Sequence, residues 1–252
     1  MNYQFQRVQE IAKKNKKYRK AYRQMIIKYE HEARNTLLPQ IGQDGVLSDL
    51  EIVVAHYNEN LEWLKPFSQI TTIYHKDEYT DSEFPSYFSR DKIKYLPNIG
   101  RESHTYLTHI IDRWDSLSSW TFFTQGGLQD HLDNLQTLPP CYYLFGGLIE
   151  NRLFTANLIH HRWGLPLTYN SNHTFTDWWR SLEITDKNKP IPPESDPNYL
   201  WAPGAFFGIH RDQIKKRSKL FYQKILDTLQ TPDPIEGHYC ERSWAYIFKY
   251  LQ

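Results

Sequence analysis

The chain has 252 residues, of which 40% are hydrophobic and 15% aromatic, and its formal net charge is +1 at pH 7. This length suits one large globular domain with a continuous core and a terminal appendage. Two cysteines, Cys141 and Cys240, lie far apart without a Cys-x-x-Cys motif, which indicates neither a zinc cage nor a disulfide framework. Because no apolar run approaches the ~20 residues of a membrane span and no signal-peptide core follows Met1, we expect a cytoplasmic protein.

The charge is distributed unevenly along the chain. Residues 1–36 contain ten Lys and Arg residues and three Asp and Glu residues, which gives a net charge of +7. The remaining residues contain 20 Lys and Arg residues and 26 Asp and Glu residues, which gives a net charge of −6. Apolar residues at a helical period predict a basic helical arm over residues 1–38, followed by a linker at 39–49. Such an arm can lie on anionic lipid, which would make the protein peripheral to the membrane, or it can pack on its own domain. Nucleic-acid binding is not expected, because the rest of the chain is acidic.

The first half of residues 50–252 alternates strand and helix signals. An unbroken apolar run at Ile52–Ala55 is typical of a strand buried on both faces. Further strands are predicted at residues 70–76, 93–96 and 119–127, and helices at 61–67 and 102–117. This order predicts one α/β domain with a mixed, mostly parallel central sheet flanked by helices.

The second half is less regular. Proline-rich residues 187–199 predict a loop, and residues 200–214 predict a strand with a Pro-Gly entry. Helical periodicity predicts helices at residues 149–165, 175–182, 219–230 and 236–251.

Polar side chains follow several predicted strands where each strand ends. The first strand is followed by His56–Glu59, the third by Asn98–His104, and the fourth ends in Gln125–Gly127. Ligands of α/β proteins collect outside the carboxyl ends of the strands. We therefore expect these three segments to converge on one ligand site.

The segment from Asn98 to His104 has the pattern of an anion site. Pro97 fixes the backbone before a turn, and Gly100 allows a sharp entry into the helix that a side chain would obstruct. Free backbone N–H groups and the helix dipole favour an anion at such a helix start. Capping and surface charge explain the same residues equally well.

Familiar catalytic signatures are missing, including Gly-x-Ser-x-Gly, His-Glu-x-x-His and the glycine-rich phosphate loops. Asp130, His131 and Asp133 could surround a divalent ion or form a polar loop. Glu241 is expected at the start of the last helix. There a carboxylate receives free N–H groups and stays ionised, as a general base must, although an acid that only complements the dipole fits the position as well.

Five stretches together resemble a family described as a domain of unknown function: EIVVAHYNENLEWL, LPNIGRESHTYLTHII, TFFTQG, APGAFFGIHRDQI and EGHYCERSWAYIF. The resemblance covers about residues 50–250, and its most specific part is the core LPN-x-GRE-x-HTYL. Members of this family look like glycosyltransferases of the glycosyltransferase-A fold. The resemblance thus implies a single domain of that fold over residues 50–252.

The resemblance also implies the site. A nucleotide sugar would lie at the strand ends, and a glycan or glycolipid acceptor would approach a carboxylate late in the chain, with Glu241 as the base of an inverting transfer. The implied donor contacts are His56, Tyr57, Asn58, Glu59, Asn98, Gly100, Arg101, His104, Gln125 and Gly126. The implied acceptor contacts are Trp201, Pro203, Gly204 and Ala205.

One departure from the family pattern concerns the metal. Most enzymes of this fold place Asp-x-Asp after the fourth strand to hold Mn²⁺ or Mg²⁺ on the diphosphate, and this chain has Thr124–Gly127 there. Either Asp130 and His131 hold a metal, or the reaction is metal-independent and Arg101 neutralises the leaving diphosphate. A competing account makes Arg101 a structural partner of an acid such as Asp112 or Glu59.

Two other functions stay open. The chain could be a non-catalytic carbohydrate- or nucleotide-binding protein of the same fold, or a metal-dependent hydrolase that uses Asp130, His131 and His104. Tight binding without turnover would indicate the first. Hydrolysis of a nucleotide sugar without acceptor, abolished by a chelator, would indicate the second.

Overall fold

The computed structural model describes residues 49–76, 84–127, 153–156, 159–160, 174–182 and 200–248. The predictions for the basic arm, most of the linker, the loop at 187–199 and the candidate metal ligands Asp130 and His131 lie outside these residues. The side chains of Trp201 and Pro203 also lie outside what is described. Within the described residues, no helix is long and apolar enough to cross a membrane.

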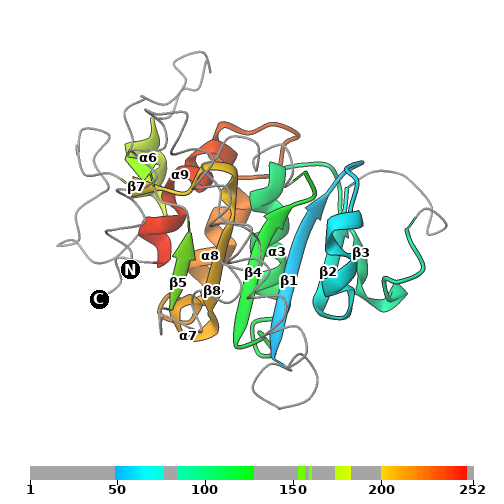
Figure 1. Cartoon of the computed structure of the whole chain (residues 1–252). Helices are drawn as coiled ribbons and strands as arrows, with labels where there is room; N and C mark the ends of the chain where they lie inside the picture. The colour runs from blue at the N-terminus through cyan, green and yellow to red at the C-terminus, as the bar shows by residue number, and fades with distance from the viewer. Residues whose placement is uncertain are drawn as a thin grey trace, which may run out of the picture.

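The centre of the structure is a six-stranded sheet with the strand order β3-β2-β1-β4-β8-β5 (Figure 1). Four neighbouring strands run parallel: β1 (Leu50–His56), β2 (Thr71–His75), β3 (Ile93–Tyr95) and β4 (Trp120–Gln125). The antiparallel strands are β8 (Phe207–His210) and, pairing with β8 in turn, β5 (Phe154–Ala156). A separate small sheet joins β6 (Ile159–His160) to β7 (Leu200–Trp201). The predicted α/β architecture with a mixed, mostly parallel sheet is confirmed.

Helices cover both faces of the sheet. The helical segments are η2 (Glu62–Ile70), η4 (Arg90–Lys92), α3 (Arg101–Asp112), α6 (Phe175–Ser181), η5 (Pro203–Ala205), α7 (Arg211–Ile214), α8 (Lys219–Asp227) and α9 (Ile235–Phe248). On one face, α3, α8 and α9 pack together against the sheet (Figure 1). On the other face, η2 covers β1 with Leu64 and Phe67. Each face therefore has its own hydrophobic core.

The sequence of β1 explains why the strand is central. All seven of its residues are buried. Val53 and Ala55 point into the core with α3, α8 and α9, and Ile52 and Val54 point into the core with η2. Because side chains of a strand alternate between faces, a strand buried on both sides needs a continuous apolar run, as predicted.

Two predictions about local structure are wrong. A helix was predicted over residues 149–165, but the described part contains β5 and β6. Phe154 and Ala156 pair with Ile209 and Phe207 of β8, so sheet pairing with a distant segment overrides the local helical periodicity. The predicted strand within 200–214 is interrupted, because the turn η5 separates β7 from β8.

Candidate functional site

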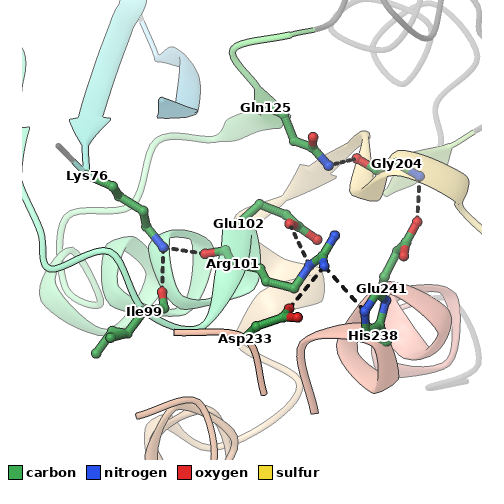
Figure 2. A network of polar contacts seen from close by, with 9 residues as sticks. All are labelled: Lys76, Ile99, Arg101, Glu102, Gln125, Gly204, Asp233, His238 and Glu241. Atoms are coloured by element: carbon green, nitrogen blue, oxygen red, sulfur yellow. Dashed lines mark hydrogen bonds and ion pairs between the residues drawn. The ribbon is translucent and has the colours of Figure 1, made fainter. Parts of the chain in front are cut away.

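The carboxyl ends of β1 and β4 bring two of the predicted polar segments together. Ala55 pairs with Gln125, and the Gly126 N–H donates to the Ala55 carbonyl at 2.9 Å. The third segment reaches the same edge through the start of α3. There the buried Lys76, which follows β2, donates from Nζ to the Ile99 carbonyl at 2.7 Å and also to the Arg101 carbonyl (Figure 2). The polar segments therefore lie along one edge of the sheet, although only His56–Glu59 line the pocket described next.

A pocket of about 410 Å³ opens at the end of β1. Four of its lining residues, His56–Glu59, were predicted as donor contacts, whereas the ring-rich wall of His75, Phe84 and Tyr87 was not. The pocket is lined by His56, Tyr57, Asn58, Glu59, Asn60, Leu61, Glu62, His75, Phe84, Pro85 and Tyr87. These residues include two carboxylates and no Lys or Arg, so the pocket suits an uncharged ligand with hydroxyl groups better than a phosphate.

Two buried histidines form the floor of this pocket. The Nδ1 atoms of His56 and His75 lie 2.9 Å apart, so one imidazole donates and the other accepts. The second nitrogen of His56, Nε2, lies 3.0 Å from the Glu59 carbonyl. The Glu59 carboxylate accepts from the Tyr57 backbone N–H at 2.8 Å. These contacts fix the loop that follows β1.

Gly126 has a packing role at the end of β4. A Cβ atom at this position would lie 2.7 Å from Glu59 Oε2. The Gly126 carbonyl accepts from the Trp63 indole N–H at 3.0 Å, and its N–H is engaged by β1. Gly126 therefore lets the Glu59 carboxylate rest on the end of β4, a role that sequence spacing did not indicate.

The start of α3 requires glycine at position 100, as predicted. Gly100 has φ +61°, and a Cβ atom there would lie 2.6 Å from the Leu229 carbonyl oxygen. Its N–H donates to the Thr231 carbonyl at 2.8 Å. Arg101 follows with φ 52°, which is unusual for a residue with a side chain. The segment after α8 thus holds α3 in place at Gly100, the residue that precedes the helix.

The Arg101 side chain spans α3 and the segment before α9 (Figure 2). Its Nη1 lies 3.2 Å from Asp233 Oδ1 and 3.3 Å from His238 Nε2. Its Nε lies 3.8 Å from Glu102 Oε2. The partner acids of Arg101 are therefore Asp233 and Glu102, in place of the predicted Asp112 or Glu59. Because 36% of the Arg101 side chain and 61% of the Asp233 side chain are exposed, an anion from solution could reach this arginine.

Glu241 lies in the second turn of α9, because that helix begins at Ile235. The prediction that Glu241 starts the helix and receives its free N–H groups is therefore wrong. Its Oε1 accepts instead from the Gly204 backbone N–H at 2.7 Å. The Gly204 carbonyl accepts from Gln125 Nε2 at 3.0 Å (Figure 2). Residues from β4, η5 and α9 are thus joined in one chain of hydrogen bonds.

Burial shifts the pKa values of three groups near the start of α3. Burial and then the Glu241 charge raise the pKa of Glu102 to about 7. Burial lowers the pKa of Lys76 to about 8, against an opposing effect of Glu102. Burial and the nearby Lys76 charge lower the pKa of His104 to about 4, so this imidazole is neutral at pH 7. Among the described residues, no group of three His, Cys, Asp or Glu side chains could hold a metal ion.

The fold and site define an α/β protein with a polar cluster and a pocket at the carboxyl edge of a mostly parallel sheet. Residues 52–139 match the model of a family described as a protein of unknown function (DUF3431). The match supports the predicted resemblance to a family of unknown function over residues 52–139, a shorter stretch than the predicted residues 50–250. No curated protein and no solved structure matches the chain.

Proposed function

We propose that the protein is a glycosyltransferase that moves a sugar from a nucleotide-sugar donor to a glycan or glycolipid acceptor. One observation carries this proposal: the pocket at β1 and the Glu241 carboxylate are linked through Gln125, the last residue of β4, and Gly126, which follows it. Glu59 of the pocket packs on Gly126, and Gln125 holds the carbonyl of Gly204, whose N–H binds Glu241. A ligand site and a carboxylate thus occupy one edge of the sheet, as a transfer between two substrates requires.

The charges along this edge favour one orientation of the donor. The nucleoside, which is uncharged and rich in hydroxyl groups, suits the pocket with its rings and its carboxylates Glu59 and Glu62. The diphosphate suits the start of α3, where Arg101 adds a full charge to the helix dipole. The remaining proposed donor contacts are Asn98, Gly100, His104, Gln125 and Gly126. The sugar would then lie between Arg101 and Glu241.

The chemistry follows from that arrangement. The Glu241 carboxylate takes the proton of an acceptor hydroxyl, and the oxygen attacks the anomeric carbon of the sugar. The bond from that carbon to the diphosphate oxygen breaks, and the electron pair leaves with the diphosphate, where Arg101 offsets its charge. A single displacement inverts the anomeric configuration. Gly204 and Ala205 of η5, with Trp201 and Pro203 beside them, are the proposed acceptor side.

The residues that could hold Mn²⁺ or Mg²⁺, Asp130 and His131, lie outside the described residues. Arg101 and the start of α3 support a metal-independent reaction, because together they supply positive charge to the diphosphate. Addition of a chelator to an active preparation distinguishes the two forms of the proposal.

The test combines binding with turnover. Nucleotides and nucleotide sugars that raise the melting temperature identify the donor, and transfer is then measured with wild type and Glu241→Gln. The variant should bind the donor almost normally while transfer falls by about 10²–10⁴-fold, the range for a lost general base. Near-normal turnover would remove Glu241 from its role. Tight donor binding without turnover in the wild type would support the non-catalytic alternative.

A further inference from the structure

Glu102 is a buried carboxyl that the proposed reaction does not yet use. It lies in the first turn of α3 with 8% of its surface exposed. Figure 2 shows its side chain on the same side of α3 as Arg101, facing the space between Gln125 and Glu241. Few donors surround this carboxyl in the part of the chain that the structure describes, although burial of an ionised carboxylate is unfavourable unless it is well paired.

The cation nearest to Glu102 pairs with it weakly. Arg101 Nε lies 3.8 Å from Glu102 Oε2, which is too long for a hydrogen bond. The Nη1 of the same guanidinium lies closer to Asp233 and His238, at 3.2 and 3.3 Å. Its own backbone N–H and the Lys76 charge also favour the ionised form. The ionised form is thus only partly compensated.

Charged and titratable groups from three elements act on Glu102. Glu241 of α9 raises its pKa, whereas Arg101 of α3 and Lys76 after β2 lower it, and burial is the largest cause of the rise to about 7. Glu102 in turn contributes to the raised pKa values of Tyr106 and Cys240. Near neutral pH, a substantial fraction of Glu102 is therefore protonated and can donate a hydrogen bond, and the Glu241 carboxylate, whose charge acts on Glu102, can accept one.

We propose that Glu102 and Glu241 form a carboxyl pair that binds one sugar hydroxyl group, with Glu102 donating a hydrogen bond to its oxygen and Glu241 accepting from its hydrogen. This inference rests on the proposed function. It makes Glu102 a determinant of substrate binding at the site where Glu241 acts as base. It also predicts that transfer declines when Glu102 ionises, because the ionised carboxylate can only accept.

The pH dependence of transfer tests this role, because glutamine at position 102 retains the donor and cannot ionise. Wild-type transfer should fall about tenfold per pH unit above pH 7, as the protonated fraction of Glu102 falls. Glu102→Gln should stay active to pH 9. Glu102→Ala should be reduced roughly tenfold or more at pH 6, where wild-type Glu102 is protonated, as for a lost hydrogen bond, and the difference from wild type should shrink above pH 7. Glu236→Gln, on the same helix as Glu241, is the control and should keep the wild-type profile.

A second readout tests the pair without any substrate. In protein labelled with ¹³C at the glutamate carboxyl carbons, one signal should titrate near pH 7, be absent in Glu102→Gln, and titrate at lower pH in Glu241→Gln. A Glu102 signal that titrates near pH 4.5, or that is unmoved in Glu241→Gln, overturns the pair. If the transfer rate of Glu102→Gln falls above pH 7 as in the wild type, or if Glu102→Ala keeps full activity, Glu102 does not bind the sugar hydroxyl group. The two tests also separate the proposals. If the ¹³C signals show that Glu102 and Glu241 influence each other's titration but no nucleotide sugar is turned over, the transferase function and the binding of a sugar hydroxyl are both wrong, and only the electrostatic pairing of the two carboxyl groups remains.

Discussion

Glu51 and Glu102 are two glutamates with nearly the same burial, at opposite ends of the parallel strands. Glu51 lies near the start of β1 and is 9% exposed, and Glu102 lies beyond the carboxyl ends and is 8% exposed. The Thr72 and Ser118 hydroxyls donate to Glu51 at 2.6 and 3.2 Å, and His109 Nε2 lies 3.4 Å from it. No comparable set of donors surrounds Glu102 within the described part of the chain.

The pKa values of these two residues move in opposite directions. Burial raises the pKa of Glu51, but the hydrogen bond and charge of His109, with the Thr72 hydroxyl, outweigh burial and lower it to about 2. For Glu102, burial and the Glu241 charge outweigh Arg101, the backbone N–H and Lys76, and raise the pKa to about 7. Two carboxyl groups of nearly the same burial can therefore differ in charge at neutral pH. The difference depends on how many hydrogen-bond donors and positive charges lie around each one. Glu51, whose charge is well compensated by donors, has a structural role. Glu102, whose charge is only partly compensated, is the carboxyl group for which we propose a role in substrate binding.

The largest expected effect is the loss of stability when Glu51, the residue with the structural role, is replaced. Glu51→Ala should lower the free energy of unfolding by about 3–5 kcal/mol, because it leaves His109, the buried Thr72 hydroxyl and the partly buried Ser118 hydroxyl without this acceptor. Urea unfolding at pH 7 measures this. Glu62→Ala, whose side chain is 64% exposed, is the control and should change stability by less than about 0.5 kcal/mol.

Acid titration of the same residue sharpens the comparison. The folded-state pKa of Glu51 lies below its ordinary value, so its stabilisation is present above pH 4.5 and is lost as pH falls towards 2. The loss amounts to about 3 kcal/mol in wild type and should be absent in Glu51→Gln. An equal acid dependence in both proteins would contradict the assignment of charge to Glu51.

Glu102 should have the opposite dependence. Its folded-state pKa lies above the ordinary value, so stability falls as pH rises from about 4.5 to about 7. Glu102→Gln carries no charge and should therefore be more stable than wild type at pH 8, by at most about 3 kcal/mol, and equal to it at pH 4. Melting temperatures at the two pH values measure the difference. A variant less stable than wild type at pH 8 would mean that Glu102 is a structural acid like Glu51.

The smallest effect concerns the arginine that only partly compensates Glu102. Arg101→Ala should weaken nucleoside-diphosphate binding by roughly 10- to 150-fold, because a charge-assisted contact contributes about 1.5–3 kcal/mol. Arg101→Lys should recover part of the affinity, since lysine lacks the forked donors that fit phosphate oxygens. Calorimetric titration with a nucleoside diphosphate measures both variants.

Asp233→Asn provides the matched control for Arg101. This ion pair is largely exposed, so its loss should cost less than about 1 kcal/mol of stability. Arg101→Ala that lowers the melting temperature and leaves nucleotide affinity intact would assign Arg101 to structure alone. The diphosphate would then need another binding site, and the comparison between the two ends of the strands would depend on Glu51 and Glu102 alone.

The sequence by itself determined the elements whose burial follows from local pattern. The apolar run of β1 and the stripe of Leu107, Ile110 and Ile111 on α3 could be recognised because period 2 and period 3.6 are properties of a single segment. The need for Gly100 was also local, since a sharp entry into a helix restricts the backbone directly. From these elements the parallel order and the convergence of polar strand ends follow, because parallel strands carry their ends to the same edge.

Only the tertiary structure decided which side chains meet there. The segment 154–156 became an edge strand because β8 was available to pair with it, and Glu241 contacts Gly204 because it lies in the second turn of α9, where η5 packs. Asp233 reached Arg101 across 132 positions, which no local pattern contains. The charge of Glu102 depends on burial and on Glu241, a residue on a different helix. Strand pairing, burial and electrostatic coupling are properties of the folded chain. They determine why Glu51 is held as a charged structural group while the pKa of Glu102 is raised towards neutral pH.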